Sequence, residues 1–443
     1  MKLTDMLAQI DPECTLWTFP NTSLSAKALA NSVNMCRQSL QCDPNSRVAI
    51  EVSDSASALI WMLALDGIAG TVFLAPDSLR RSDIYPALKK RYDASSTIYC
   101  AATALQQDFE VNITAHESEP VLTRWVLATS GTTGTPKLIE HTTESLTRTC
   151  KADNQRGKDY TWGLIYDPFR FAGMQVALQS LASGSHLVFA NTLPTIGAQI
   201  SFLHKNGVNA LSATPTYWRK LLMSGEFKGL RLKQITLGGE PADQTVLNAL
   251  AKAFPGARIT QIYASTEAGV GFSVTDGKAG FPYEYLAYGV RGNQLSISNS
   301  GTLLIKPEKH TPISTGGVAL ADDTGYIDTG DLVMQRDSRV YFLGRDSGAI
   351  NVGGNKVIPE EVEAVIREVD GVAEVIVKPQ TSGVMGQLVA AEVQMEEAVS
   401  DKNILKRAVI SHCREHLDKY KVPALIRFVA EIEYNTTGKL SRK

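Results

Sequence analysis

A run of glycine, hydroxyl and lysine residues at positions 129–137 has the composition of a loop that could bind phosphate. It is Thr-Ser-Gly-Thr-Thr-Gly-Thr-Pro-Lys, and it follows the apolar stretch Trp125-Val126-Leu127-Ala128. Glycines let the backbone N–H groups approach a ligand, hydroxyls add donors, and lysine adds positive charge. The order differs from the G-x-x-x-x-G-K-[ST] loop of nucleotide kinases, because Lys137 follows a proline and precedes Leu138. On composition alone, a solvated turn explains the segment equally well.

Further stretches with glycines, carboxylates and a lysine follow along the chain. They are Gly238-Gly239-Glu240-Pro241, Tyr263-Ala264-Ser265-Thr266-Glu267, Tyr326-Ile327-Asp328-Thr329-Gly330-Asp331, Gly344-Arg345, Gly353-Gly354-Asn355-Lys356-Val357 and Asn435-Thr436-Thr437-Gly438-Lys439-Leu440. With the 129–137 loop, they resemble in order the motifs of the adenylate-forming superfamily. This superfamily comprises acyl- and aryl-CoA synthetases, peptide-synthetase adenylation domains and luciferases. The resemblance runs from Thr129 to Lys439 and so covers most of the chain.

The resemblance implies an ATP site with Mg²⁺. The residues that would wrap the β- and γ-phosphates are Thr129, Ser130, Gly131, Thr132, Thr133, Gly134 and Lys137. Gly239 and Glu240 would lie beside adenine, and Tyr263 would stack on it. Asp331 would accept both ribose hydroxyls, and Arg345 is expected beside the ribose or phosphate. Thr266 would donate to the α-phosphate, and Glu267 would hold Mg²⁺, which prefers oxygen ligands.

The resemblance also implies two half-reactions served by one mobile domain. Lys439 would bridge the carboxylate and the α-phosphate during adenylation. Rotation about a hinge at Ser347 would then withdraw it and bring Gly353 and Gly354 to the site, where missing side chains leave a tunnel for a pantetheine arm. Ala264 replaces the glycine of the family's Y-G-x-T-E motif, which is tolerable only if its φ angle is negative.

An acyl pocket is expected by resemblance in four segments. Its predicted residues are Phe169, Arg170, Phe171, Gly173, Thr214, Gly238 and Val270. The phenylalanines suit an aromatic or aliphatic acid. Arg170 could bind a second carboxylate, although a salt bridge within the protein explains it more simply.

Elements that would position these residues are visible in the hydrophobic pattern. Strands are predicted at 47–52, 71–74, 96–100, 233–237 and 258–263, with helices at 55–65 and 244–254. Their alternation predicts parallel sheets covered by helices. The apolar stretch 56–75 is therefore interpreted as a buried helix, a glycine turn and a strand, and not as a membrane span.

The pattern changes near Gly344. A helix beginning at Pro359, strands at 373–377, 388–393 and 425–429, and a helix at 402–417 predict a compact α+β unit. The acidic residues Glu360, Glu361 and Glu363 suit the start of that first helix. We thus expect a large N-terminal α/β domain (1–346) with parallel-rich sheets covered by helices, and a small mobile α+β C-terminal domain (347–443). His412 and His416 match an H-x-x-E-H zinc pattern, but a solvated helix face explains them better.

The amino-acid composition of the chain excludes some classes of function. The chain has 443 residues, 44 lysines and arginines and 46 aspartates and glutamates, and hence a net charge of -2. No global positive field is available for nucleic acid. Six cysteines without a C-x-x-C pair suggest free thiols, and the absence of a leader pattern at the start suggests a cytoplasmic protein.

Together these features predict an ATP-dependent ligase. It would adenylate a small-molecule carboxylic acid, release pyrophosphate, and transfer the acyl group to CoA or to the phosphopantetheine of a carrier protein. Two alternatives remain open. One is a stand-alone adenylation protein that loads only a carrier, with amino acids among its substrates. The other is a non-catalytic nucleotide-binding relative.

Overall fold

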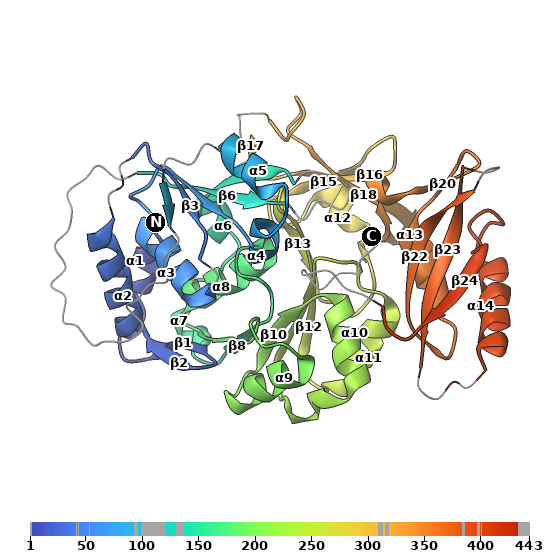
Figure 1. Ribbon diagram of the computed structural model, residues 1–443, viewed down its shortest axis with the longest axis horizontal. Helices are drawn as coiled ribbons and strands as arrows, with labels where there is room; N and C mark the ends of the chain where they lie inside the picture. Colours follow the sequence, from blue (N-terminus) through green and yellow to red (C-terminus); the bar gives the residue numbers. More distant parts are fainter. Residues whose placement is uncertain are drawn as a thin grey trace.

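A computed structural model describes most of the chain (Figure 1). The described residues are 2–40, 42, 44–52, 54–92, 96–98, 121–129, 136–308, 313–314, 319–382, 386–396, 399 and 401–432. Within them, no helix is both long and apolar enough to span a membrane.

A six-stranded sheet forms the first layer. Its order is β17 (Ile313–Ser314), β7 (Leu138–Thr142), β6 (Arg124–Ala128), β4 (Thr71–Leu74), β3 (Arg47–Ile50) and β5 (Ser96–Ile98). The neighbours among β3, β4, β5 and β6 pair in parallel, whereas β7 is antiparallel to both β6 and β17. Helix α3 (Ser55–Leu65) is buried along its whole length, and Asp54 caps it. The apolar stretch 56–75 is thus a core helix followed by strand β4, as predicted.

An eight-stranded sheet forms the second layer. Its order is β13 (Gly269–Val274), β12 (Arg258–Ser265), β11 (Gln234–Gly238), β10 (Ala210–Ala213), β8 (Thr161–Leu164), β9 (His186–Phe189), β1 (Thr15–Phe19) and β2 (Thr22–Ser25). All neighbours from β1 to β12 pair in parallel, and only the two outermost pairs are antiparallel.

Helices follow the parallel strands, as expected for βα units. They are α8 (Phe171–Ser183), α9 (Ile196–Lys205), α10 (Pro215–Ser224) and α11 (Gln244–Ala253). A core that includes Leu211, Ile235 and Leu250 lies between the sheet and the last three of these helices. The remaining helices are α1 (Leu3–Leu7), α2 (Ala26–Ser39), α4 (Asp77–Arg80), α5 (Tyr85–Tyr92), α6 (Thr143–Thr147), α7 (Asn154–Gly157) and the 3₁₀ turn η2 (Glu226–Gly229).

A third sheet is antiparallel and continues the large domain. Its order is β14 (Phe281–Pro282), β19 (Arg339–Arg345), β18 (Ile327–Arg336), β16 (Thr302–Lys306) and β15 (Gln294–Ile297), with helix α12 (Glu284–Tyr288) beside it. The long hairpin of β18 and β19 pairs Asp331 with Arg345. This pairing matters because both residues belong to predicted motifs.

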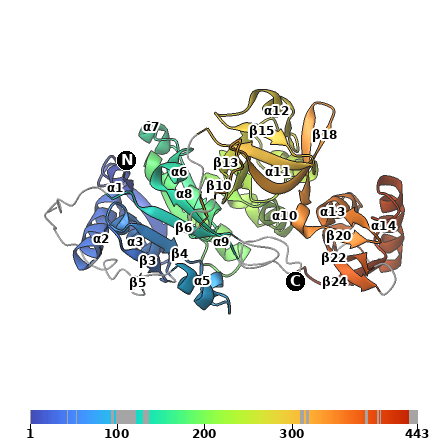
Figure 2. The ribbon, with the colours of Figure 1, turned by 90° about the horizontal axis from the view of Figure 1, so that it is seen from above.

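A smaller unit follows the 3₁₀ turn η3 (Asp346–Gly348). It contains β20 (Ile350–Val352), β21 (Asn355–Val357), α13 (Pro359–Arg367), β22 (Val372–Ser382), β23 (Gly386–Met395), α14 (Lys402–His416) and β24 (Leu425–Val429). These strands form one sheet over a separate core that includes Val362, Val375 and Val409. Figures 1 and 2 place this unit at the end of the molecule opposite α1 and α2. The predicted fold, a large parallel-rich domain with a small α+β domain, is confirmed.

Candidate active site

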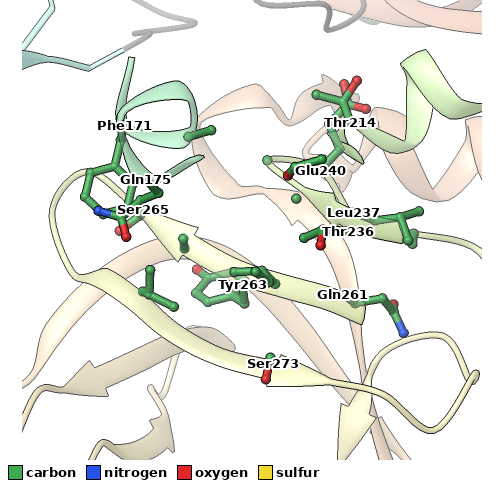
Figure 3. Close-up of a pocket in the computed structure, with 18 of the residues that line it drawn as sticks. Phe171, Gln175, Thr214, Thr236, Leu237, Glu240, Gln261, Tyr263, Ser265 and Ser273 are labelled. Atoms are coloured by element: carbon green, nitrogen blue, oxygen red, sulfur yellow. The ribbon is translucent and has the colours of Figure 1, made fainter. Parts of the chain in front are cut away.

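One cavity of about 1610 Å³ collects most of the residues that the sequence singled out. It includes the carboxyl ends of the parallel strands β10, β11 and β12, where open α/β sheets usually bind ligands, and it extends along these strands. The predicted residues that line it are Thr129, Lys137, Arg170, Phe171, Thr214, Gly238, Gly239, Glu240, Tyr263, Thr266, Glu267, Val270, Asp331, Arg345 and Ser347. Figure 3 shows Thr214, Glu240 and Tyr263 around this pocket.

Several predicted residues lie elsewhere. Phe169 and Gly173 do not line this cavity, and their place in the acyl pocket stays a prediction. Phe169 is a core side chain with 4% exposure, and Gly173 is required by packing, because a Cβ there would lie 2.2 Å from the carbonyl oxygen of Asp167. Ser130, Gly131, Thr132, Thr133, Gly134 and Lys439 lie outside the described residues.

Tyr263, Asp331 and Arg345 form a hydrogen-bonded group at the cavity wall. The Tyr263 hydroxyl donates to Asp331 Oδ2 at 2.6 Å, and Arg345 Nε donates to Asp331 Oδ1 at 2.9 Å. Burial, together with the Asp331 carboxylate, raises the pKa of Tyr263 well above its ordinary value. Burial alone would lower the pKa of Arg345, but Asp331 and Glu267 raise it. Tyr263 therefore remains a neutral donor, and Arg345 remains a cation facing two carboxylates.

The Tyr263 ring is fixed by aromatic neighbours. It stacks on Phe272 at a centroid distance of 5.1 Å and on Phe342 at 4.9 Å, with interplanar angles of 15° and 8°. Residue 264 lacks a positive φ, since Arg291 and Asp337 are the only described non-glycine residues with one. The condition under which Ala264 can replace glycine is thus met.

The T-G-D turn sets the position of Asp331. Thr329 Oγ1 donates to the Leu303 carbonyl at 2.7 Å and accepts from the Asp331 N–H at 3.2 Å. Gly330 has a φ of 67°, a conformation that favours glycine. The hydroxyl and the glycine of this motif therefore explain how the carboxylate reaches the cavity.

The two ends of the predicted phosphate loop are joined to each other. The Thr129 N–H donates to the Lys137 carbonyl at 2.9 Å, and the Lys137 N–H donates to Thr129 Oγ1 at 3.0 Å. This pairing continues the antiparallel ladder of β6 and β7. Both residues line the cavity, so the base of the loop is anchored at its edge.

A buried histidine lies beside the turn that carries Thr266. His141 is 2% exposed, its ring packs against Phe171 at 5.6 Å, and its Nε2 makes no hydrogen bond within the described residues. Burial lowers the pKa of His141 to about 4. The side chain is therefore neutral near pH 7.

Arg170 is held mainly by the protein. Its Nη2 donates to Ser78 Oγ at 3.1 Å, and the nearby Asp167 partly offsets the burial that lowers the pKa of Arg170. The structure thus supports the internal use of this arginine that the sequence suggested.

The small domain contributes helix α13 to the cavity. Glu360, Glu363 and Arg367 line it, whereas Gly353 and Gly354 do not, and a Cβ on Gly354 would meet no atom within 4 Å. Arg367 donates to Glu374 at 2.7 Å. Glu360 and Glu361 lie in the first turn of α13, as the helix-start interpretation predicts, whereas Glu363 accepts the Val377 N–H at 2.8 Å.

Two charged residues of the large domain, Arg219 and Asp243, lie near the ion pair of Arg367 and Glu374. Arg219 on α10 and Asp243, the cap of α11, lie 3.4 Å apart, and Figure 2 shows α10 beside α13. Burial alone would raise the pKa of Glu374, but Arg367 and Arg219 lower it. The contact between the two domains is therefore electrostatically matched in this arrangement.

The zinc-like histidines have structural partners. His412 Nε2 lies 3.1 Å from Glu368 Oε2, and His416 Nδ1 lies 2.9 Å from the His412 carbonyl. The described residues contain no group of three or more metal-ligating side chains.

Comparison with known families agrees with this geometry. The model of the AMP-binding enzyme matches residues 113–290, and that of the AMP-binding enzyme C-terminal domain matches residues 361–439. The protein belongs to the AMP-binding enzyme family. A 2-succinylbenzoate–CoA ligase of Bacillus pumilus is 28% identical over 364 residues, which cover 76% of this chain and 70% of that protein.

Two further relatives of this AMP-binding enzyme are covered over a smaller share of their own length. The mitochondrial acyl-coenzyme A synthetase ACSM5 of Homo sapiens is 26% identical. The matched residues make up 71% of this chain and 59% of that protein. Surfactin synthase subunit 1 of Bacillus subtilis is 28% identical, but only 10% of its length is covered.

Solved structures share the fold. The o-succinylbenzoate CoA synthetase (MenE) of Bacillus subtilis, in complex with its acyl-adenylate intermediate, has a TM-score of 0.74 at 19% identity, covering 99% of this chain and 96% of that one. The anthranilate CoA ligase AuaEII, in complex with anthranoyl-AMP, has a TM-score of 0.75 at 17% identity, covering 100% and 96%.

Two features of this AMP-binding enzyme were missed by sequence reasoning. The sequence predicted Tyr263 as an adenine neighbour but gave no sign that its hydroxyl bonds to Asp331, because 68 residues separate the two. Phe342 was not singled out either, since an apolar residue in a strand has no distinguishing signal.

Proposed function

We propose that this AMP-binding enzyme is an ATP-dependent carboxylic acid–thiol ligase. The observation that carries the proposal is the convergence of Asp331, Arg345 and Glu267 on one cavity with the anchored base of the 129–137 loop. Ligase relatives that cover most of this chain, including the 2-succinylbenzoate–CoA ligase, support it.

The first half-reaction joins two anions. A carboxylate oxygen attacks the α-phosphorus of ATP, a bond forms between them, and the bond to pyrophosphate breaks. Positive charge must therefore lie near the transferring phosphorus. Lys137 and Arg345 supply it among the described cavity residues, and Thr266 would donate to the α-phosphate.

The residues at the cavity fit ATP with Mg²⁺. Glu267 offers a hard carboxylate oxygen, and Mg²⁺ in such sites is commonly held by one or two carboxylates together with substrate phosphates. When bound, the ion would neutralise phosphate charge. Asp331 accepts from Tyr263 and Arg345 but keeps further lone pairs for the ribose hydroxyls. Gly239 and Glu240 would lie beside adenine.

The loop residues Ser130, Gly131, Thr132, Thr133 and Gly134 would complete the phosphate site, and Lys439 would assist the attack. We place the domain boundary between residues 346 and 347, so that the short turn η3 (Asp346–Gly348) would act as the hinge. Rotation there would bring Gly353 and Gly354, which are away from the cavity in this arrangement, to the site.

In the second half-reaction, the sulfur of CoA or of a carrier-bound phosphopantetheine attacks the acyl carbon. A thioester forms, AMP leaves, and the thiol proton passes to solvent. The five described cysteines are all free thiols, which supports a reducing compartment such as the cytoplasm.

Acid-dependent exchange of labelled pyrophosphate into ATP tests this proposal. A screen should include fatty, aromatic, hydroxy and amino acids. We expect exchange with at least one acid class, and thioester formation on adding CoA or a carrier. ATP binding without any acid-dependent exchange would favour the non-catalytic alternative.

A further inference from the structure

The cavity extends well beyond the nucleotide edge, along one face of the eight-stranded sheet. Strands β8, β10, β11 and β12 are parallel and in register. Alternate residues of a strand share a face, and residues paired in register share a row. On that face the cavity-lining residues include Gly238 with Ile262; Ser212 with Thr236 and Thr260; and Trp162 with Gln234 and Arg258.

Helix α8 forms the facing wall. Phe171, Gln175, Gln179 and Ser183 all line the cavity, and their spacing of four residues places them on one side of the helix. Figure 3 shows Phe171 and Gln175 across the pocket from Thr236. A groove therefore runs from the proposed acyl site down the sheet, about 6–7 Å for each row.

The sheet side of this groove is polar. Gln234 Nε2 donates to Thr236 Oγ1 at 3.2 Å and to Thr260 Oγ1 at 3.0 Å. Since both hydroxyl oxygens accept from this amide, each hydroxyl can still donate its own hydrogen to a ligand. The Tyr166 hydroxyl is also buried, beside Ser212 of this row. Buried polar groups normally have partners, so a ligand with acceptor oxygens fits this row.

The solvent exposure of the residues of β12 agrees with an open groove. No residue of β12 is buried, although β12 lies between two other strands, and Arg258 at its start is exposed. Parallel sheets are usually covered on both faces. The groove thus continues to solvent at its far end, where Arg258 lies.

We infer that the acid activated by this enzyme is an extended carboxylic acid with an oxygen acceptor, such as a hydroxyl or keto group, far from its carboxylate. The inference rests on the proposed function, because it assigns a substrate class to the same site. From Ala264 to Thr260 is four strand residues, about 13 Å. An extended chain of roughly ten to twelve atoms covers that distance, at the spacing of an extended peptide backbone.

Matched acids test the inference. Dodecanoic acid and 12-hydroxydodecanoic acid differ only in the distal oxygen, and hexanoic acid is too short to reach Thr260. In acid-dependent pyrophosphate exchange, we expect kcat/KM to be about tenfold or more higher for the hydroxy acid than for dodecanoic acid, because an alkyl chain leaves the threonine hydroxyls unpaired.

Two substitutions test whether the threonine hydroxyls cause the preference for the hydroxy acid. Thr260→Val and Thr236→Val keep the shape of the side chain and remove the hydroxyl. Each should lower kcat/KM for 12-hydroxydodecanoic acid by about fivefold or more, through KM, while activity with hexanoic acid stays within about twofold. Thr22→Val, on the far edge of the same sheet, is the matched control. It should change neither kcat/KM for 12-hydroxydodecanoic acid nor the activity with hexanoic acid.

The possible results distinguish a failure of the proposed function from a failure of the groove inference. Absence of exchange with every acid of the wider screen would refute the proposed function itself. Exchange with hexanoic acid alone, or equal kcat/KM for the two long acids, would overturn the groove inference and leave the proposed function intact. Calorimetry with sulfamoyl analogues of the two long acyl-adenylates gives a readout without turnover, and equal affinities there would also contradict it.

Discussion

The Tyr263 hydroxyl donates a 2.6 Å hydrogen bond to Asp331 Oδ2 and thereby joins two sheets of the large domain at the cavity. Tyr263 lies on β12 of the parallel sheet, and Asp331 lies on β18 of the antiparallel sheet. The other carboxylate oxygen of Asp331 accepts from Arg345. The orientation of the proposed ribose-binding carboxylate therefore depends on residues from both sheets.

Tyr263→Phe should weaken ATP binding. The ring would still stack on Phe272 and Phe342, but Asp331 would lose one of its two orienting donors. A hydrogen bond to a charged group contributes about 1.5–3 kcal/mol, so we expect KM for ATP in the exchange assay to rise about tenfold or more. Tyr285→Phe removes a hydroxyl that donates to the Ser273 carbonyl and is the control. An unchanged KM for ATP in Tyr263→Phe would contradict the role of this bond.

The proposed division of labour in the small domain predicts opposite effects of two substitutions. Lys439→Ala should abolish acid-dependent pyrophosphate exchange and spare thioester formation from a supplied acyl-adenylate. Gly354→Trp should leave exchange intact and block thioester formation by filling the path of the thiol. Equal loss of both half-reactions in Lys439→Ala, or a normal thioester yield in Gly354→Trp, would argue against domain alternation.

Arg367→Met should destabilise the small domain strongly. Arg367 pairs with Glu374 and Glu363, whose exposures are only 3% and 2%. Removing one partner of a buried ionic group leaves charge uncompensated, which typically costs about 3–5 kcal/mol. Urea unfolding should show a loss of this order. The control Arg407→Met changes an exposed arginine of α14 and should shift stability by no more than about 0.5 kcal/mol. A similar small shift for Arg367→Met would show that the cluster contributes little.

His141 should make the protein less stable in acid. Its folded pKa of about 4 lies below the ordinary 6.5, so between these values the unfolded chain binds a proton that the folded chain does not. The contribution is therefore lost as pH falls from about 6.5 to about 4, by about 3 kcal/mol in total. His141→Leu removes this titration, and its unfolding free energy should depend less on pH over that range. Parallel pH profiles for the two proteins would rule out a buried neutral histidine.

Local patterns predicted many elements because their causes are local. Helix α3 and strands β4 and β24 have the predicted bounds, since an apolar run with a cap or a turn on each side fixes them. The motif residues Asp331, Glu267 and Arg345 were identified from their order along the chain, which the family resemblance supplied.

Other parts depend on distant pairings that a single sequence does not encode locally. The row of Ser212, Thr236 and Thr260 arises from the register of three strands, and each of these residues taken alone is an ordinary strand residue. Phe169, which the sequence predicted in the acyl pocket, is a buried side chain that does not line this cavity. Its neighbours Arg170 and Phe171 do reach the cavity, and only the path of the turn before α8 directs the Phe169 side chain into the core.

Oxygen-isotope transfer tests the central proposal most directly. The protein would be incubated with ATP, Mg²⁺, CoA and an acid that supports exchange, labelled with ¹⁸O in its carboxylate. Because a carboxylate oxygen attacks the α-phosphorus and stays there when the thiol attacks the acyl carbon, we predict one ¹⁸O atom in AMP and none in pyrophosphate. Unlabelled AMP, or label in orthophosphate with ADP as the product, would contradict the proposed reaction.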